Sequence, residues 1–315
     1  MRHLLTLLSV AGLTVLLAAC GSSDESDGDV TISGSSTVQP LVSRLAGNFV
    51  SENPRARFDL EAPGTGEGFL LFCDGLTDIN NASWPIAPVE RRACRANGVE
   101  YVELEIARDA AVVAMSEREK LPECLSLAQL FSLTGPTASA TDTWDGIGPS
   151  SQVPQGNFEL VAPSSSSGTS EVFIDLVISD RAELRAQPAE LRRDTLSVAS
   201  DQLVGDVVRE SPGTMGVLGY TVASTEAGIR LIDIADTGGC IAPGRDSIEA
   251  GTYPLIRSLF MYVNTERAGE NPTLRSFVES VIDEDLGEVV ADAGSIPVPG
   301  SVSESNQAAW SDGGQ

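Results

Sequence analysis

A run of hydroxyl side chains that ends in glycine and threonine, residues 164–169 (Ser-Ser-Ser-Ser-Gly-Thr), has the composition of an anion-binding turn. The apolar residues 158–162 before it predict a strand that ends at Pro163, and residues 172–178 predict a helix. Free N–H groups and aligned peptide dipoles at the start of a helix attract negative charge, and the hydroxyls add further donors. The stretch therefore indicates a site for an anion, although a Ser-rich turn that only caps a helix has the same composition.

Two earlier turns have the same character. Residues 34–38 (Gly-Ser-Ser-Thr-Val) follow an alternating strand pattern at residues 29–33 and precede a helix with an apolar face. Residues 64–69 (Gly-Thr-Gly-Glu-Gly-Phe) follow a second strand at residues 57–61 and lead into another apolar helix. Three strand-to-helix turns rich in glycine and hydroxyl groups favour one shared anion site over three unrelated helix caps.

The chain contains one histidine, His3, in a segment that we expect to be removed. Without imidazole, Ser-His-Asp and Cys-His catalysis are excluded and the commonest zinc ligand is missing. A secreted serine hydrolase would need a lysine or carboxylate base instead, and Lys120, the only lysine, lies in a polar Glu-Arg-Glu-Lys stretch ill suited to an activated amine. We therefore expect no catalytic residue, metal or cofactor, with a histidine-free hydrolase kept as an alternative.

Length and charge set broad limits on the fold and on the partners. A chain of 315 residues exceeds the usual size of a single hydrophobic core, so we expect two lobes. The formal net charge of −25 repels nucleic acid and anionic membrane surfaces, which both bind through Lys and Arg. We therefore expect no nucleic-acid partner and no contact with a bilayer except through a covalent anchor.

The first twenty residues are organised like a secretory signal, with a basic start, an apolar run from Leu4 to Leu17 and small residues before Cys20. The ending Leu-Ala-Ala-Cys-Gly resembles a bacterial lipobox, which implies that Cys20 becomes the lipidated first residue of the mature protein. Ordinary cleavage that leaves an unpaired thiol is the alternative. Residues 21–28 are polar and acidic and predict a flexible tether.

Four cysteines remain besides Cys20. An even number in an exported protein predicts disulfides, and three pairings are possible. We prefer Cys73–Cys94, which closes a short loop, and Cys124–Cys240, which closes a long one, and each should stabilise the fold by about 3–5 kcal/mol if loop entropy dominates. A four-cysteine metal site is the alternative, but the chain has no Cys-x-x-Cys pair.

Six motifs follow one another in a characteristic order and spacing. They are residues 34–38, 64–69, 78–83, 167–169, 213–220 and 253–260. Each motif alone is weak, but the ordered set resembles the phosphate-binding lipoproteins that serve as substrate-binding subunits of Pst-type ABC phosphate importers. The resemblance covers essentially the whole mature chain.

The resemblance implies an α/β fold, the two-lobed class II periplasmic-binding-protein fold, with two crossing strands as a hinge and a ligand cleft between the lobes. Residues 101–106 and 110–115 read as strands that lead into the second lobe, and residues 255–263 read as the strand that returns. The expected boundaries are 29–115 with 255–300 for lobe 1, 116–254 for lobe 2, and 301–315 for a polar tail.

The resemblance also implies a ligand set of hydroxyl and backbone donors. Its members are Ser36, Thr37, Thr65 or Gly66, Ser83, Ser167, Gly168 and Thr169. Two positions depart from the family pattern, because Trp84 stands where many relatives carry Asp or Arg and Pro163 stands where some carry Arg. The site must then borrow an arginine or rely on dipoles, and it lacks the usual acceptor for a phosphate proton. Glu67 is a candidate substitute, with a solvated first-turn carboxylate as the alternative.

The function implied by the resemblance is that of a monomeric, non-enzymatic receptor, held on the outer side of the bacterial cell membrane by its lipid. It would close on inorganic phosphate and pass it to the permease subunits of an ABC importer. A receptor for sulfate, molybdate or arsenate is the alternative of the same class. An adhesin or a phosphate sensor without transport, and the histidine-free hydrolase, are the alternatives of other classes.

Overall fold

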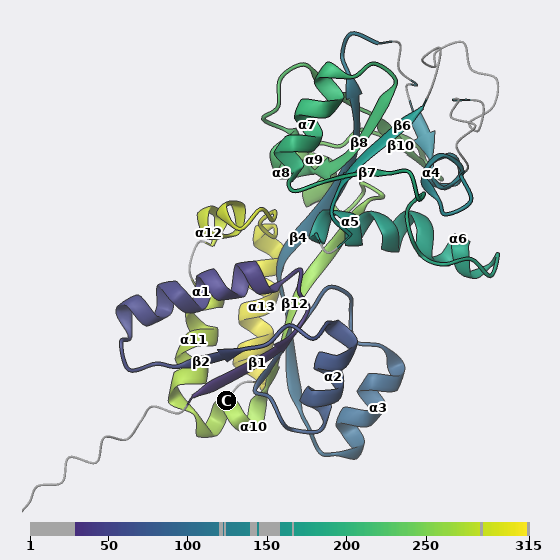
Figure 1. Ribbon diagram of the computed structural model, residues 1–315. Helices are drawn as coiled ribbons and strands as arrows, with labels where there is room; N and C mark the ends of the chain where they lie inside the picture. Colours follow the sequence, from purple (N-terminus) through teal and green to yellow (C-terminus); the bar gives the residue numbers. More distant parts are fainter. Residues whose placement is uncertain are drawn as a thin grey trace, which may run out of the picture.

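The computed structural model describes residues 29–119, 122, 124–138, 144, 158–165, 167–283 and 286–313. The signal segment with Cys20, the tether at residues 21–28 and Lys120 lie outside these residues. Figure 1 shows two α/β lobes joined by a pair of long strands. Within the described part of the chain, no helix combines the length and apolarity needed to cross a bilayer.

Lobe 1 is built on a sheet with the strand order β2-β1-β3-β12-β4. β1 pairs in parallel with β2 and β3, whereas β12 is antiparallel to both of its neighbours. Its elements are β1 (Val30–Gly34), α1 (Gln39–Glu52), β2 (Phe58–Leu60), α2 (Thr65–Cys73), β3 (Ile79–Ala82), α3 (Pro88–Ala96), β4 (Tyr101–Ser116), β12 (Ile256–Asn264), α10 (Thr265–Glu270), α11 (Pro272–Asp283), α12 (Gly287–Asp292) and α13 (Gly300–Gly313).

Lobe 2 continues the same sheet through β4 in the order β4-β8-β6-β7, with β9 also on β4, and adds a small sheet β11-β10-β5. Its elements are β5 (Cys124–Ser126), α4 (Leu127–Thr134), β6 (Glu159–Pro163), α5 (Gly168–Phe173), the π-helical turn η2 (Ile174–Ser179), α6 (Asp180–Glu183), β7 (Leu196–Val198), α7 (Asp201–Glu210), β8 (Thr214–Gly219), α8 (Tyr220–Ala223), β9 (Ile229–Leu231), β10 (Asp233–Asp236), β11 (Gly239–Ile241) and α9 (Arg245–Glu249).

The strands β4 and β12 connect the lobes and pair with each other along nine residues of β12. The sequence predicts two strands at residues 101–106 and 110–115, but the structure has one uninterrupted strand of 16 residues there. The register shifts between Leu259 and Phe260, where a β-bulge interrupts the ladder. A third segment reaches the junction, because the N–H of Arg108 donates to the carbonyl of Ile296 at 2.8 Å and the reverse bond measures 2.7 Å.

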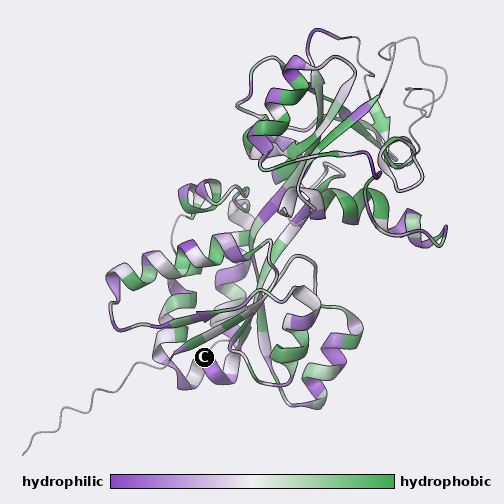
Figure 2. Ribbon diagram, viewed as in Figure 1, coloured by the Kyte–Doolittle hydropathy of each residue, from purple (hydrophilic) through white to green (hydrophobic). Residues whose placement is uncertain are grey.

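Each lobe has its own hydrophobic core, which is why two lobes form rather than one. In lobe 1, α1 and α11 pack over the sheet around Leu104 and Phe277, and in lobe 2 the helices α5 and α7 pack around Val161 and Phe173. Figure 2 shows hydrophobic residues along the strands and on the inner faces of these helices, with hydrophilic residues facing outward. Burial of such side chains contributes about 25 cal/mol per Å² of apolar surface.

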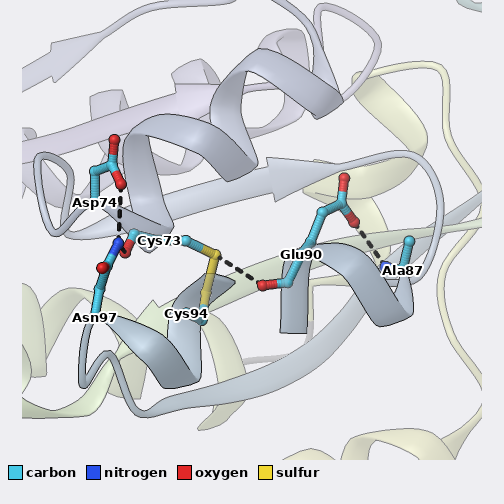
Figure 3. The surroundings of a disulfide bond; sticks show 6 residues. All are labelled: Cys73, Asp74, Ala87, Glu90, Cys94 and Asn97. Carbon is cyan, nitrogen blue, oxygen red and sulfur yellow. Dashed lines mark hydrogen bonds between the residues drawn. A yellow bond between two sulfur atoms is a disulfide. The ribbon is translucent and has the colours of Figure 1, made fainter. Parts of the chain in front are cut away.

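Two disulfides lie within the lobes, one in each. Cys73–Cys94 joins α2 to α3, and Cys124–Cys240 joins β5 to β11, which is the pairing that the sequence analysis prefers. The four-cysteine metal site is excluded because all four sulfurs are paired. Figure 3 shows that Asn97 supports the first disulfide, since its Nδ2 donates to the carbonyl of Cys73 and to Asp74 Oδ1, both at 2.9 Å.

The C-terminal segment differs from the expected polar tail. Residues 300–313 form the helix α13, which packs against β4 and α11. Trp310 is buried in the core of lobe 1, and the amide of Asn306 pairs with the backbone of Glu105, donating at 2.8 Å and accepting at 3.2 Å. The polar composition of residues 301–315 did not predict this helix, because the helix docks through one aromatic ring and one side-chain amide rather than through an apolar stripe.

Candidate functional site

A cleft of 390 Å³ lies at the junction of the lobes, and residues from both lobes line it. Four members of the predicted ligand set are among its walls, namely Thr37, Ser167, Gly168 and Thr169. The other four, Ser36, Thr65, Gly66 and Ser83, lie in lobe 1 outside this lining. The structure therefore brings the first and third turns together at the cleft, whereas the second turn contributes no residue to the cleft lining.

The third turn begins α5 and caps it. Ser167 Oγ accepts a hydrogen bond from the N–H of Ser170 at 3.2 Å, and the hydroxyl of Ser170 donates to the carbonyl of Pro163 at 3.0 Å. The alternative that this Ser-rich stretch caps a helix is thus correct for Ser167. The cap leaves Gly168 and Thr169 lining the cleft, where the hydroxyl of Thr169 donates to Asp201 Oδ2 at 3.1 Å.

The first and second turns are held against each other by two glycines. Gly34 has φ +124°, and a Cβ there would lie 2.0 Å from the carbonyl oxygen of Asn81. A Cβ on Gly68 would lie 2.1 Å from Asn80 Oδ1 and 2.5 Å from Gly34 Cα. Only residues without a side chain fit this crossing.

The second turn and the end of β3 share a buried hydroxyl pair. Thr65 Oγ1 and Ser83 Oγ lie 3.1 Å apart, and the N–H of Ser83 donates to Thr65 Oγ1 at 3.2 Å. Both residues are buried in this form of the protein. These two predicted donors therefore satisfy each other.

Arg257, on the hinge strand β12, is a site residue that sequence reasoning missed. Its NH2 donates to Thr37 Oγ1 at 2.8 Å and to the carbonyl of Gly168 at 3.4 Å, so it joins the first turn to the third. Its NH1 donates to Asp175 Oδ2 at 3.2 Å. Although the guanidinium is buried, its Nε has no hydrogen-bond partner among the described residues. The signal in the sequence is a charged residue inside an apolar strand, which requires partners when it is buried.

Glu171, in the first turn of α5, is the second residue that sequence reasoning missed. Its carboxylate accepts a hydrogen bond from the hydroxyl of Ser36 at 3.3 Å and another from the hydroxyl of Thr37. Oε2 also lies 3.6 Å from NH2 of Arg257. A carboxylate of lobe 2 is therefore held by hydroxyls of lobe 1.

Three further carboxylates line the cleft: Asp109, Asp201 and the exposed Asp292. Burial raises the pKa of Asp109 above its ordinary value, while Arg257 and a 3.1 Å hydrogen bond from Ser295 act in the opposite direction. Burial also raises the pKa of Asp201, against the smaller effect of the Thr169 hydroxyl and the Gly219 amide. Asp201 Oδ1 is buried and has no hydrogen-bond partner in the described part of the chain.

The structure also shows where the two departures from the family pattern, Trp84 and Pro163, and the candidate acceptor Glu67 lie. Trp84 follows β3 and is 42% exposed, so it is not part of a core. Glu67 is exposed on the first turn of α2 and is not among the residues that line the cleft. Pro163 ends β6 and lines the cleft without offering a charge.

Replacing Asp201 with asparagine should stabilise the ligand-free protein at pH 7 and lose that advantage below about pH 4. Burial raises the pKa of Asp201 above its ordinary value of 3.8, so the folded protein holds this proton more tightly than the unfolded chain does. In wild type, the stability that the protonated Asp201 contributes is therefore fully present below the pKa of Asp201 in the unfolded chain. It is lost as the pH rises through the pKa of Asp201 in the folded protein. Melting temperatures of wild type and Asp201→Asn from acid to neutral pH would measure this, and a difference that is independent of pH would contradict it.

Comparison with known proteins places these features in a family context. A family model described as a PBP superfamily domain matches residues 21–285. The chain is 32% identical to Protein SphX of Synechocystis over 93% of this chain and 85% of that protein. It is 30% identical to the phosphate-binding protein PstS of Staphylococcus epidermidis over 92% of this chain and 87% of that protein.

Two solved structures share the fold. A possible phosphate-binding protein from Planctomyces limnophilus superposes with a TM-score of 0.82 at 27% identity, covering 91% of this chain and 99% of that one. An ABC-type phosphate transport receptor from Vibrio cholerae superposes with a TM-score of 0.64 at 20% identity, covering 85% and 99% respectively. The second likeness concerns the fold alone.

Proposed function

The chain belongs to the PBP superfamily, and from that premise we propose that it is an extracytoplasmic receptor that binds inorganic phosphate for an ABC importer. The observation that carries the proposal is the meeting of the first turn, in lobe 1, and the third turn, in lobe 2, at a buried guanidinium. Thr37 of lobe 1 and Gly168 of lobe 2 are joined by Arg257 beside the cleft. The relatives named as phosphate-binding proteins support the choice of ligand.

The chemistry of these residues suits a tetrahedral oxyanion. A dehydrated phosphate needs many donors, because a buried charge without partners is very costly. The hydroxyls of Thr37 and Thr169 and the N–H groups of Gly168 and Thr169 are donors of this kind. The Nε–H of Arg257, which has no partner among the described residues, is another. Some relatives carry an arginine at the position of Pro163. Arg257 takes the place of that arginine here, since it brings positive charge to the same turn from another strand.

Closure of the lobes would complete the ligand set. Ser36, Thr65, Gly66 and Ser83 all belong to lobe 1, and bending of β4 and β12 would carry lobe 2 toward them. A ligand that bridges donors of both lobes stabilises the closed form by its higher affinity for that form. In this proposal the hydroxyls of Thr65 and Ser83 exchange their mutual contact for contacts with the ligand.

We assign the acceptor of the phosphate proton to Asp201. Two observations support Asp201 rather than Glu67: Asp201 lines the cleft beside Thr169, and its buried Oδ1 lacks a partner among the described residues. Glu67 is exposed, as a solvated residue in the first turn of a helix would be. Hydrogen phosphate carries a proton and can donate a hydrogen bond to such an acceptor, whereas sulfate carries no proton. This carboxylate would therefore determine the selectivity for phosphate over sulfate.

The relatives and the N-terminal sequence support a proposal for the cellular setting. We propose that Cys20 carries a lipid that holds the protein on the outer side of the bacterial cell membrane, and that the permease subunits of an ABC importer receive the phosphate. The protein acts as a monomer that binds and releases its ligand without chemical change.

Calorimetric titration of the refolded soluble protein with phosphate and with sulfate tests the proposal. Wild type should bind phosphate and not sulfate, and Asp201→Asn should lose most of this selectivity while Glu67→Gln keeps it. Sulfate, molybdate or arsenate as the preferred ligand of wild type would replace phosphate in the proposal. Selectivity lost in Glu67→Gln and kept in Asp201→Asn would return the acceptor role to Glu67.

A further inference from the structure

The carboxylate of Glu171 is bound by hydroxyls that belong to the predicted ligand set. Its two oxygens accept from Ser36, at 3.3 Å, and from Thr37, and Oε2 lies 3.6 Å from NH2 of Arg257. Two hydroxyl donors and a guanidinium around an anionic group form the environment proposed above for phosphate. In the structure, a carboxylate of the protein occupies part of it.

The two anions cannot share these donors. A hydroxyl has one proton to donate, so Ser36 and Thr37 must turn away from Glu171 before they can donate to a ligand. An ionised carboxylate left beside a bound phosphate would also repel it, which is costly where water is excluded. Ligand binding at this turn therefore requires the carboxylate to leave.

From this geometry we infer that Glu171 is an internal competitor of the ligand, and this inference rests on the proposed function. The carboxylate holds the donors of the first turn in the ligand-free protein and swings out when phosphate arrives. The side chain is 32% exposed, so a path to solvent is open. Because Glu171 lies in the helix that begins with Gly168, the competitor and the donors of the third turn move together.

The other carboxylates around Arg257 do not have this arrangement. Asp175 pairs with NH1 of Arg257, and its side chain is 48% exposed. Asp109 lies 4.0 Å from Arg257 and accepts from Ser295, which is outside the predicted ligand set. Glu171 alone, among the described carboxylates near Arg257, accepts from Ser36 and Thr37.

The competitor also links the lobes before a ligand is present. Ser36 and Thr37 belong to lobe 1, whereas Glu171 belongs to α5 in lobe 2. Phosphate must break these contacts to bind, and the cost of breaking them reduces the free energy gained on binding. Removing the carboxylate of Glu171 should therefore strengthen phosphate binding, even though a contact between the lobes is lost. A residue with a purely structural role would give the opposite result.

Titration of Glu171→Gln and Glu171→Ala with inorganic phosphate tests the inference. Both refolded variants should bind phosphate about tenfold or more tightly than wild type, because the competing charge is gone. The matched control is Glu183→Gln, which makes the same charge change at an exposed position of α6, further along the same run of helix, and should bind like wild type.

The outcomes separate the inference from the function on which it rests. If wild type binds phosphate and both Glu171 variants bind it equally or more weakly, the inference is wrong and the receptor function stands. If wild type shows no measurable binding of phosphate but a Glu171 variant binds it, the inference is strongly supported. If wild type, both Glu171 variants and Glu183→Gln all fail to bind phosphate and sulfate, the proposed function and the inference are both wrong.

Discussion

Arg257→Met should weaken phosphate binding by about 100-fold or more. The guanidinium is buried at the junction of the lobes, donates to Thr37 and Gly168, and brings positive charge to a turn that has none of its own. Truncating one member of a buried, hydrogen-bonded charge pair costs about 2–5 kcal/mol, and tenfold in affinity corresponds to about 1.4 kcal/mol. Calorimetric titration of the refolded variant would measure the loss.

The same substitution also removes a partner from three carboxylates, those of Asp109, Glu171 and Asp175. Arg257→Lys therefore serves as a second variant, because it keeps the charge but not the fork of donors, and it should fall between wild type and Arg257→Met. Arg245→Met is the matched control, since its side chain is 77% exposed on α9, and it should bind phosphate normally. Wild-type affinity in a folded Arg257→Met protein would remove Arg257 from the site.

Gly68→Ala should destabilise the protein by about 3 kcal/mol, because a methyl group there overpacks a tight crossing. The added Cβ would lie 2.1 Å from Asn80 Oδ1 and 2.5 Å from Gly34 Cα, and the latter is backbone that cannot rotate away. The first and second turns would have to separate, so phosphate binding should weaken as well. Denaturant unfolding of the ligand-free protein would measure the first effect.

A glycine in an open environment gives the matched control for this crossing. Gly47 lies inside α1, and a Cβ there would meet nothing within 4 Å. Gly47→Ala should therefore stabilise the protein by about 0.5–1 kcal/mol, since alanine favours the helix. If Gly68→Ala were as stable as wild type, the two turns would not need their close contact.

The sequence predicted the local features of the site well, because each depends on neighbours along the chain. The turns at residues 34–38 and 64–69 follow strands and open helices as expected, and Ser167 caps a helix. The disulfides have the preferred pairing. The α/β fold with two lobes also agrees with the resemblance on which it rested.

The contacts that give the site its charge could not be predicted in the same way. Arg257 is 220 positions from Thr37, and Glu171 is 134 positions from it. Both residues reach the first turn only because β12 enters lobe 1 and α5 lies beside the hinge, and no spacing in the sequence encodes either approach. Helix α13 was missed for a related reason, since Asn306 finds its partner, Glu105, on a strand 201 residues earlier.

The central position of β12 has a consequence for the order in which the molecule can fold. β12 lies between β3 and β4, yet among the described residues it is the last strand along the chain. The strand order β4-β8-β6-β7 is complete once residue 219 has been made, whereas β3 and β4 keep unpaired edges until residue 264 is available. The lobe that contains the beginning of the chain is therefore the last to close its sheet, and during synthesis its exposed strand edges are where mispairing between nascent chains would begin.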